Sequence, residues 1–360
     1  MEEKLREIGG VFQIPGQFYA YSTLVQGNIN ATYRVIYQKD DGTTVTYVFQ
    51  KINTYVFKKP DEIMANIERV TSHIMNEHPD DVCLTFYHTA DGKNYYNDTD
   101  GSFWRIMKNV DGITFDICED LAYVRATGQA FGHFQMQLSD FDGSQLYETI
   151  PDFHNTTKRL ETLFEHAEED PCGRVKDVAE ELSYIRSVAD KACELSNRFT
   201  RGELPVRVTH NDTKANNVIF DRRTKKPLVV IDLDTVMPGM PMYDFGDAVR
   251  FIANTSVEDE PDTSVVFFDT AKFRAFAEGF LGEVNDSLSQ DEIDGMVLGV
   301  FGITVELAAR FLDDYIMGDK YFKTNYAGHN LVRTRCQLKL AKDIQKKYEE
   351  LCWIVRTCVR

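Results

Sequence analysis

Cysteine is scarce in this 360-residue chain, and its seven cysteines follow no pairing pattern. Their number is odd and no Cys-x-x-Cys pair occurs, so the sequence indicates neither a disulfide framework nor a zinc site. The eight histidines contain no His-Glu-x-x-His motif. A metal ion, where one is used, is therefore expected to have oxygen ligands. The cysteines are expected to be reduced packing residues.

Positive charge is also in short supply. Lys and Arg number 40 against 57 Asp and Glu, which gives a net charge of −17. Such a surface repels phosphate backbones and anionic head groups, so we expect neither nucleic acid nor membrane as a partner. No run of about 18 apolar residues occurs, and Met1–Glu7 lacks the apolar core of a signal peptide. We expect a soluble, cytoplasmic monomer that acts on small molecules.

Linkers, repeats and low-complexity tracts are missing too. Only 10 prolines occur, and no Gly/Ser-rich stretch divides the chain. With 43% hydrophobic residues the chain can bury a large core, and its length exceeds what one core usually organises. We therefore predict two lobes with a cleft between them, over residues 1–110 and 111–360.

The first lobe is predicted to be small and mainly β. Alternating runs at Thr32–Tyr37 and Thr44–Phe49 flank a polar turn and indicate an antiparallel hairpin. A helix is expected after Pro60, where apolar residues recur at helical spacing. Further strands are expected around Phe86 and over 103–107.

The second lobe is predicted to be larger and mainly α. From about residue 116, apolar residues recur at helical spacing over 117–138 and again over 178–192. Short apolar runs interrupt the helices at 206–208, 217–220 and 228–231, and helices resume from about Tyr243. The fold class is therefore expected to be α+β.

A polar loop, His210–Asn217, lies between the first two of these short runs. Phosphoryl transfer needs a carboxylate for the attacking hydroxyl, a cation against the developing charge and an amide oxygen for Mg²⁺. Asp212, Lys214 and Asn217 meet these needs, and their spacing fits the His-x-Asp-x-x-x-x-Asn pattern of kinase catalytic loops. We predict Asp212 as the catalytic base and Lys214 as a second catalytic residue.

Asp232 strengthens this interpretation because it ends the next strand after Asn217. A second carboxylate there can face the same metal ion, so we predict Asn217 and Asp232 as ligands of Mg²⁺ on ATP. The alternative is that Asp212 only binds turn amides and Asp232 only caps a loop, which are common tasks for aspartate.

Asp244-Phe245-Gly246 spells the metal-binding tripeptide of protein kinases. It lies beyond Asp232, and no apolar strand is evident before it. We therefore leave the metal to Asp232, predict Asp244 as the N-cap of a helix through Phe251, and regard Asp247 as structural.

The nucleotide is expected to meet the first lobe at two places. The segment Gly27–Tyr33 can close over phosphates, although an ordinary β-turn explains it equally well. The segment from Met107 to Val110 suits a hinge whose backbone meets adenine. Together with Gln50, the predicted nucleotide-binding residues are Gly27, Asn28, Asn30, Thr32, Met107 and Asn109.

Gln50 stands where a kinase strand usually carries its phosphate-binding lysine. Lys51 follows it, but strand alternation should point Lys51 to the opposite face. We expect Gln50 to contact the nucleotide through a neutral amide, with Mg²⁺ and Lys214 neutralising more of the charge. No lysine pair with Glu68 is expected.

These motifs resemble those of the aminoglycoside phosphotransferase-like kinases, and most closely those of the N-acetylhexosamine 1-kinases. The resemblance implies a bilobal protein-kinase-like fold that binds ATP and Mg²⁺ between its lobes and phosphorylates the anomeric hydroxyl of N-acetylglucosamine or N-acetylgalactosamine. It also implies that Asp212, Arg310 and Tyr321 contact the sugar and that Phe251 forms an apolar wall. The segments that carry it are Phe49–Asn53, Thr209–Lys214, Asn216-Asn217, Ile231–Thr235, Tyr243–Asp247, Arg310–Phe322 and His329–Arg335.

Two other interpretations stay open. The same chemistry can serve an aminoglycoside, a choline-like alcohol or a homoserine-like acceptor, because one fold carries different pockets. A nucleotide-binding protein without catalysis is suggested by the missing strand lysine. The intact set of Asp212, Asn217 and Asp232 argues against that last interpretation, and the pair of Arg310 and Tyr321 favours a sugar over a cationic acceptor.

Overall fold

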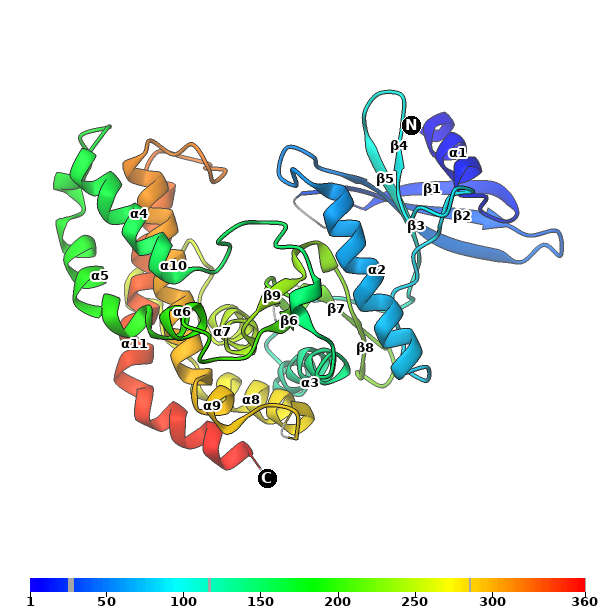
Figure 1. Cartoon of the computed structure of the whole chain (residues 1–360). Coiled ribbons are helices and arrows are strands. Elements are labelled where there is room, and N and C mark those ends of the chain that lie inside the picture. The colour runs from blue at the N-terminus through cyan, green and yellow to red at the C-terminus, as the bar shows by residue number, and fades with distance from the viewer. Residues whose placement is uncertain (25–28, 116–117, 285, 360) are drawn as a thin grey trace.

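Two lobes, joined by the segment that follows strand β5, make up the computed structural model of the chain (Figure 1). It describes residues 1–24, 29–115, 118–284 and 286–359. The first lobe is built on an antiparallel sheet and the second is mostly helical, so the predicted α+β class is confirmed.

The sheet of the first lobe has five strands in the order β1-β2-β3-β5-β4. Its helix α1 (Glu2–Val11), which the sequence pattern did not reveal, packs on one face, and α2 (Pro60–Glu77) lies on the other (Figure 1). The predicted hairpin is β2 with β3, and the proline opens α2 as expected. The strands are β1 (Gln17–Leu24), β2 (Ala31–Gln38), β3 (Thr44–Ile52), β4 (Tyr96–Asn97) and β5 (Phe103–Lys108).

Strand alternation gives this sheet two different faces. Tyr33, Phe49 and Trp104 belong to the core that the sheet shares with α1. Thr32 lies opposite Gln50 in the register, and Gln50 lies opposite Arg105, so these three form a row on the other face. Lys51 pairs with Trp104, which places it on the face away from Gln50, as predicted.

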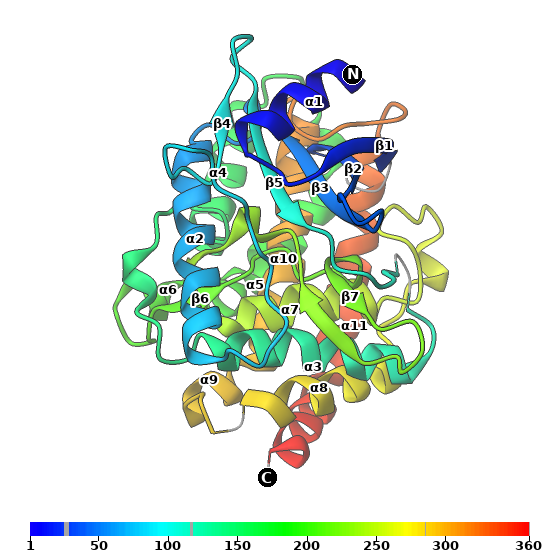
Figure 2. The ribbon, with the colours of Figure 1, turned by 90° about the vertical axis from the view of Figure 1, so that its right-hand side faces the viewer.

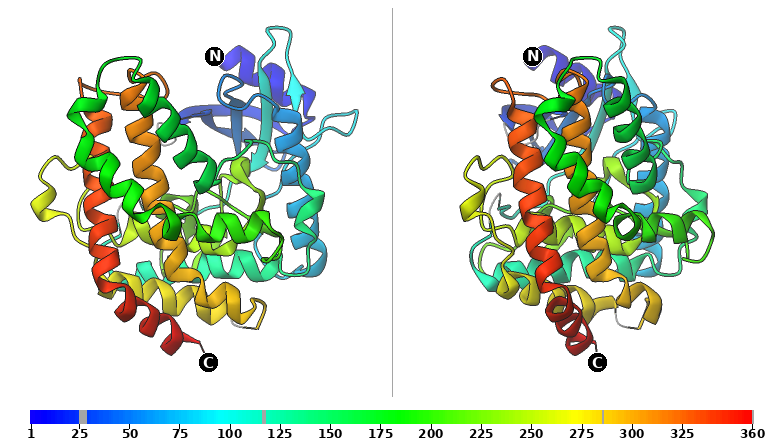
Figure 3. Two further views of the ribbon diagram at one scale, coloured as in Figure 1. Left: turned by 60° about the vertical axis from the view of Figure 1, so that its left-hand side comes forward. Right: turned by 90° about the vertical axis from the view of Figure 1, so that its left-hand side faces the viewer.

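The second lobe is a group of helices around α10, which is apolar along most of its length and packs against α4, α5, α7 and α11. Figure 3 shows α10 (orange) and α11 (red) side by side. No helix in the described ranges is long and apolar enough to cross a membrane. The helices are α3 (Leu121–Gln137), α4 (Thr156–Glu169), α5 (Ala179–Ala192), α6 (Glu194–Thr200), α7 (Pro241–Ile252), α8 (Thr270–Val284), α9 (Gln290–Asp294), α10 (Met296–Ile316) and α11 (His329–Cys358).

The second lobe also contains two small two-stranded sheets, which lie between α6 and α7 in the chain. β6 pairs with β9, and β7 pairs with β8. The strand β9, only three residues long, precedes α7, so the expectation that no strand comes before Asp244 was wrong. Two prolines within five residues had hidden it. The strands are β6 (Arg207–Thr209), β7 (Val218–Phe220), β8 (Pro227–Val230) and β9 (Met237–Gly239), with short 3₁₀ turns at Gly143–Gln145, Val175–Asp177, Ala215–Asn217, Leu233–Thr235 and Thr263–Val265.

Helix α2 is attached to the second lobe by a buried asparagine. Asn66 donates from Nδ2 to the carbonyls of Tyr147 (2.8 Å) and Val236 (3.0 Å), and its Oδ1 accepts the amide of Tyr147 (2.8 Å). Figure 2 shows α2 running down beside the second lobe. The apolar face of α2 also belongs to the same hydrophobic cluster as that lobe.

Candidate active site

The loop predicted to be catalytic connects β6 to β7 and is held in place by Asp244. The Asp244 carboxylate accepts hydrogen bonds from the backbone N–H groups of His210 (2.7 Å) and Asn211 (2.8 Å) and from the side-chain amide of Gln135 (2.8 Å). Burial raises the pKa of Asp244. His210 and the backbone amides of His210 and Asn211 offset part of this rise. Asn211 has a φ of 64°, a left-handed conformation that asparagine tolerates well.

Asp244 is therefore not the N-cap that the sequence predicted. The residue before α7 is Met240, and Pro241 takes the first helical position. Asp244 lies in the first turn of α7, where its buried side chain points back to the loop. Its task is to fix the backbone just before Asp212.

His210 ties the same loop to the end of β8. Its Nε2 donates to the carbonyl of Ile231 (2.9 Å), so Nδ1 is free to accept the amide of Asp212 (3.3 Å). The ring is fully buried and packs edge-on against Phe131 and Phe134. The tautomer and orientation of His210 are thereby fixed by its neighbours.

The side chains predicted for catalysis meet at the loop. Lys214 Nζ lies 2.8 Å and 3.0 Å from the two carboxylate oxygens of Asp212. Asn217 Nδ2 donates to the carbonyl of Asp212 (2.8 Å). Burial lowers the pKa of Lys214, but the carboxylates of Asp212, Asp247 and Asp232 together raise it. Lys214 is thus a stable cation beside a carboxylate that opens to solvent.

Asp232 follows β8, has a φ of 62° and is exposed. Desolvation by the surrounding protein, together with the carboxylates of Asp234 and Asp212, raises the pKa of Asp232 to about 6. The Asn217 carbonyl accepts the amide of Ile231, which keeps the two predicted metal ligands close in the fold. Oxygen donors in a negative field fit a hard divalent cation.

No group of three His, Cys, Asp or Glu side chains within the described ranges is arranged to hold a metal by itself. A cation at Asn217 and Asp232 would therefore depend on the oxygens of a bound ligand for further coordination, as Mg²⁺ on nucleotide phosphates does.

The predicted nucleotide residues of the first lobe lie in different settings. Gly27 and Asn28 are outside the described residues. Asn30 donates to Asp234 of the second lobe (2.7 Å), and Gln50 donates to Thr32 (3.1 Å). Their roles toward a nucleotide stay predictions.

The hinge segment already uses two of its amides. Lys108 N donates to Thr85 O (2.9 Å) and Asn109 N donates to Thr46 O (3.2 Å). Met107 pairs with Val48 in the sheet. The predicted contact of Met107 and Asn109 with adenine therefore stays a prediction and would not use those two amides.

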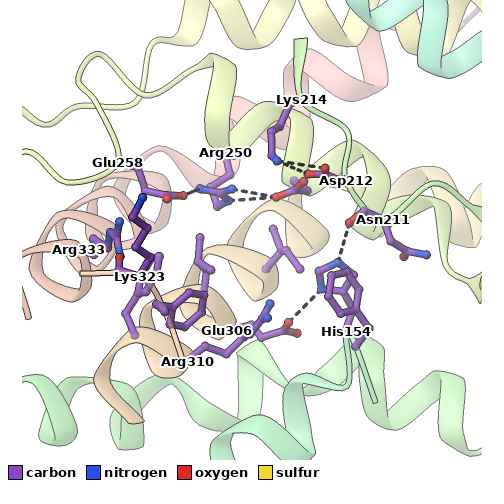
Figure 4. Close-up of a pocket in the computed structure, with 16 residues that line it drawn as sticks. His154, Asn211, Asp212, Lys214, Arg250, Glu258, Glu306, Arg310, Lys323 and Arg333 are labelled. Carbon is purple, nitrogen blue, oxygen red and sulfur yellow. Dashed lines mark hydrogen bonds and ion pairs between the residues drawn. The ribbon is translucent and has the colours of Figure 1, made fainter. Parts of the chain in front are cut away.

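A cavity of about 280 Å³ opens beside Asp212 and Lys214 in the second lobe (Figure 4). Arg310 of α10 reaches into it, with its guanidinium carbon 5.4 Å and 5.7 Å from the ring centres of Phe153 and Phe322. The residues that line it are Phe153, His154, Asn211, Asp212, Lys214, Asp247, Arg250, Glu258, Ile303, Glu306, Leu307, Arg310, Phe311, Phe322, Lys323 and Arg333.

Of the residues predicted to contact sugar, the cavity brings together Asp212 and Arg310. Phe251 is not part of its lining and packs against the helical core. Tyr321 is 73% exposed, and its ring lies 4.8 Å from that of Phe322, which does line the cavity. The contact roles of all four residues stay predictions.

His154 is a residue of this cavity that the sequence did not point to. Its Nδ1 lies 3.0 Å from Glu306 Oε1 and its Nε2 lies 3.3 Å from Asn211 O. Glu306 Oε1 and the Asn211 carbonyl are both acceptors, so the ring of His154 is placed to donate to each of them. Burial raises the pKa of Glu306, but His154, with Arg310 and Thr156, lowers it overall. The pair supports the carbonyl just before Asp212.

Residues 21–276 match the phosphotransferase enzyme family. The chain belongs to this family. The match begins within β1, ends within α8 and includes the loop of Asp212.

Solved structures with the same overall fold are also small-molecule kinases by their names. A microcompartment-associated aminopropanol kinase is 15% identical, with a TM-score of 0.63 over 99% of both chains. An amicoumacin kinase solved with AMP-PNP and Ca²⁺ is 12% identical, with a TM-score of 0.60 over 96% of this chain and 93% of that one. A choline kinase from Cryptosporidium parvum Iowa II is 12% identical, with a TM-score of 0.58 over 99% of both chains. At these identities the likeness establishes the kinase-like fold of this phosphotransferase.

Proposed function

We propose that this phosphotransferase is an ATP- and Mg²⁺-dependent kinase that phosphorylates the C1 hydroxyl of N-acetylhexosamines, N-acetylglucosamine or N-acetylgalactosamine. The kinase part is supported by the family, by the AMP-PNP and Ca²⁺ of the amicoumacin kinase, and by the cluster around Asp212. The choice of a neutral sugar is supported by the charges of the cavity.

The acidic side chains of the cavity are each paired with a base. Asp212 pairs with Lys214, and Glu306 pairs with His154. Asp247 and Glu258 share the guanidinium of Arg250. A cationic acceptor would have to break one of these pairs to find a carboxylate.

The remaining cations of the cavity have no such partner. Within the described part of the chain, no carboxylate lies within ion-pair distance of Arg310, Lys323 or Arg333. Surplus positive charge repels an ammonium group, whereas guanidinium N–H groups donate to the hydroxyl and carbonyl oxygens of a sugar. The rings of Phe153 and Phe322 add an apolar wall. This unpaired charge is the observation that carries the sugar assignment.

In the proposed reaction, Asp212 orients the C1 hydroxyl and takes its proton as the oxygen attacks the γ-phosphorus of ATP. The new bond joins that oxygen to phosphorus, and the bond between the γ-phosphorus and the bridging oxygen breaks to release ADP. Lys214 stabilises charge on the transferred group. Asn217 and Asp232 would hold the divalent cation, which supplies neutralisation of the phosphate charge when bound.

A second candidate is a kinase for amino alcohols or aminoglycosides, because related structures are named for aminopropanol, for choline and for aminoglycosides. A panel of N-acetylhexosamines, simple hexoses, choline, ethanolamine, aminopropanol and an aminoglycoside separates the two. We expect turnover on the N-acetylhexosamines, with NMR locating phosphate at C1.

The matched variant for this panel is Arg310→Gln, which removes one unpaired cation. It should raise KM for the N-acetylhexosamine about 10-fold or more, the loss expected for charge-assisted hydrogen bonds. No turnover on any N-acetylhexosamine would remove the sugar assignment, and phosphate at C6 would change the reacting hydroxyl.

A further inference from the structure

The first lobe carries a buried cation on a strand other than the one where a kinase lysine is expected. Gln50 of β3 and Arg105 of β5 are direct partners in the antiparallel register. Such partners project to the same face of a sheet at close range. Arg105 Nε donates to Gln50 Oε1 (2.9 Å), and Gln50 Nε2 in turn donates to Thr32 Oγ1 (3.1 Å). The amide at position 50 thus holds a guanidinium on the face of the sheet opposite α1.

The charge of Arg105 is directed at the second lobe. Its Nη1 forms an ion pair with Asp234, and both side chains are at most 2% exposed. The other oxygen of Asp234 accepts from Asn30 (2.7 Å), a residue at the start of β2. Arg105 also lowers the pKa of Asp232, although burial and the carboxylates of Asp234 and Asp212 raise that pKa by more. The guanidinium therefore lies among the residues predicted for phosphate and metal.

A guanidinium has five N–H donors in a planar fork. The contacts to Gln50, Asp234 and the Met64 sulfur use Nε and Nη1. No contact from Nη2 occurs among the hydrogen bonds of the described ranges. Arg105 can thus keep its supports and still donate to a phosphate oxygen.

We propose that Arg105 is the cation through which the first lobe binds the nucleotide phosphates, in place of a lysine on β3. Gln50 positions the guanidinium, and Asp234 balances its charge when no nucleotide is present. Glu68 of α2 takes no part, because it contacts Asn94 (2.9 Å) and His88 (3.3 Å) instead of a lysine. The inference rests on the proposed function, since it requires a nucleoside triphosphate between the lobes.

The test moves the charge from one strand to the other. Arg105→Gln, Gln50→Lys and the double variant Gln50→Lys/Arg105→Gln are compared with the unmutated chain. Binding of Mg²⁺-AMP-PNP and of adenosine is measured by calorimetry without an acceptor, and thermal unfolding reports whether each variant is folded. Lys51→Gln is the matched control, because it removes the neighbouring cation on the opposite face.

We expect Arg105→Gln to weaken AMP-PNP binding about 10- to 100-fold, the range for loss of charge-assisted hydrogen bonds, and to change adenosine binding less than about twofold. The double variant should recover most of the lost affinity, and Lys51→Gln should bind normally. If Arg105→Gln does not fold, a folded double variant that binds AMP-PNP supports the proposal and one that does not overturns it.

Equal losses for adenosine and AMP-PNP, or normal AMP-PNP binding by folded Arg105→Gln, would show that Arg105 only joins the lobes. Failure of the unmutated chain to bind Mg²⁺-AMP-PNP would overturn the proposed function itself and this inference with it. Turnover on an unexpected acceptor leaves the binding result unaffected, so the two failures can be told apart.

Discussion

Asp212 can be tested with a change that preserves its shape. Asn at this position can still accept from Lys214, but it cannot take up a proton. We expect Asp212→Asn to lower kcat about 10²- to 10⁴-fold, the usual contribution of general-base catalysis, while the Kd for nucleotide changes little. Steady-state kinetics and calorimetry measure the two quantities. Asp111→Asn, at a side chain that is 91% exposed, is the control, and full turnover by Asp212→Asn would exclude the assigned role.

His154 offers a second test at the residue scale, because its removal leaves the buried Glu306 carboxylate without its direct ion-pair partner. We expect His154→Gln to cost about 3 kcal/mol of unfolding free energy, as for other broken buried pairs, and to lower kcat as the Asn211 carbonyl loses its donor. Urea unfolding and kinetics report both effects.

The double variant His154→Gln/Glu306→Gln separates the charge from the contact. It should regain most of the lost stability, because no unpaired charge remains, but kcat should stay low. Stability losses that simply add would show that the two residues are not coupled.

At the scale of elements, the glycine of Asp244-Phe245-Gly246 has a packing role. A Cβ on Gly246 would lie 2.7 Å from the carbonyl carbon and oxygen of Gly299, so α7 and α10 touch through two glycines. We expect Gly246→Ala to destabilise the fold by about 1–3 kcal/mol, as overpacking does, and to lower kcat because Asp244 moves with α7. Thermal unfolding and kinetics check this. Gly282→Ala, in a helix position with nothing within 4 Å, should leave both unchanged.

At the scale of the whole molecule, Asn66 joins the lobes through three hydrogen bonds. Asn66→Ala leaves the buried carbonyl of Val236 and the part-buried carbonyl of Tyr147 without this donor, so we expect a loss of about 2–4 kcal/mol in unfolding free energy. Asn76→Ala, the same change at an exposed position of α2, should be nearly neutral. Equal unfolding midpoints in urea for the two variants would contradict the role given to Asn66.

The sequence predicted what depends on neighbouring residues. The hairpin of β2 and β3, the start of α2 at Pro60 and the loop of Asp212 between two strands follow from local spacing and turn chemistry. It could not predict what distant residues do together. Asp244 looked like a cap because its partners, His210 and Asn211, lie far back in the chain.

Arg105 and His154 were missed for the same reason. Neither belongs to a motif, and each gains its meaning from a partner more than 50 residues away. Helix α1 was missed because Gly9 and Gly10 are poor helix formers and weaken its sequence pattern. In the structure, Gly9 lets the helix approach Tyr37 closely, because a Cβ there would clash with the Tyr37 hydroxyl.

The attachment of α2 determines which part of the molecule could move. By sequence α2 lies within the first lobe, but Asn66 and its apolar face bind it to the second. Any swing that moves the sheet away from the second lobe must therefore separate the sheet from α2 or break the three hydrogen bonds of Asn66. The mechanical boundary would then run between the sheet and α2, and the five strands with α1, not residues 1–110, would travel as one rigid piece.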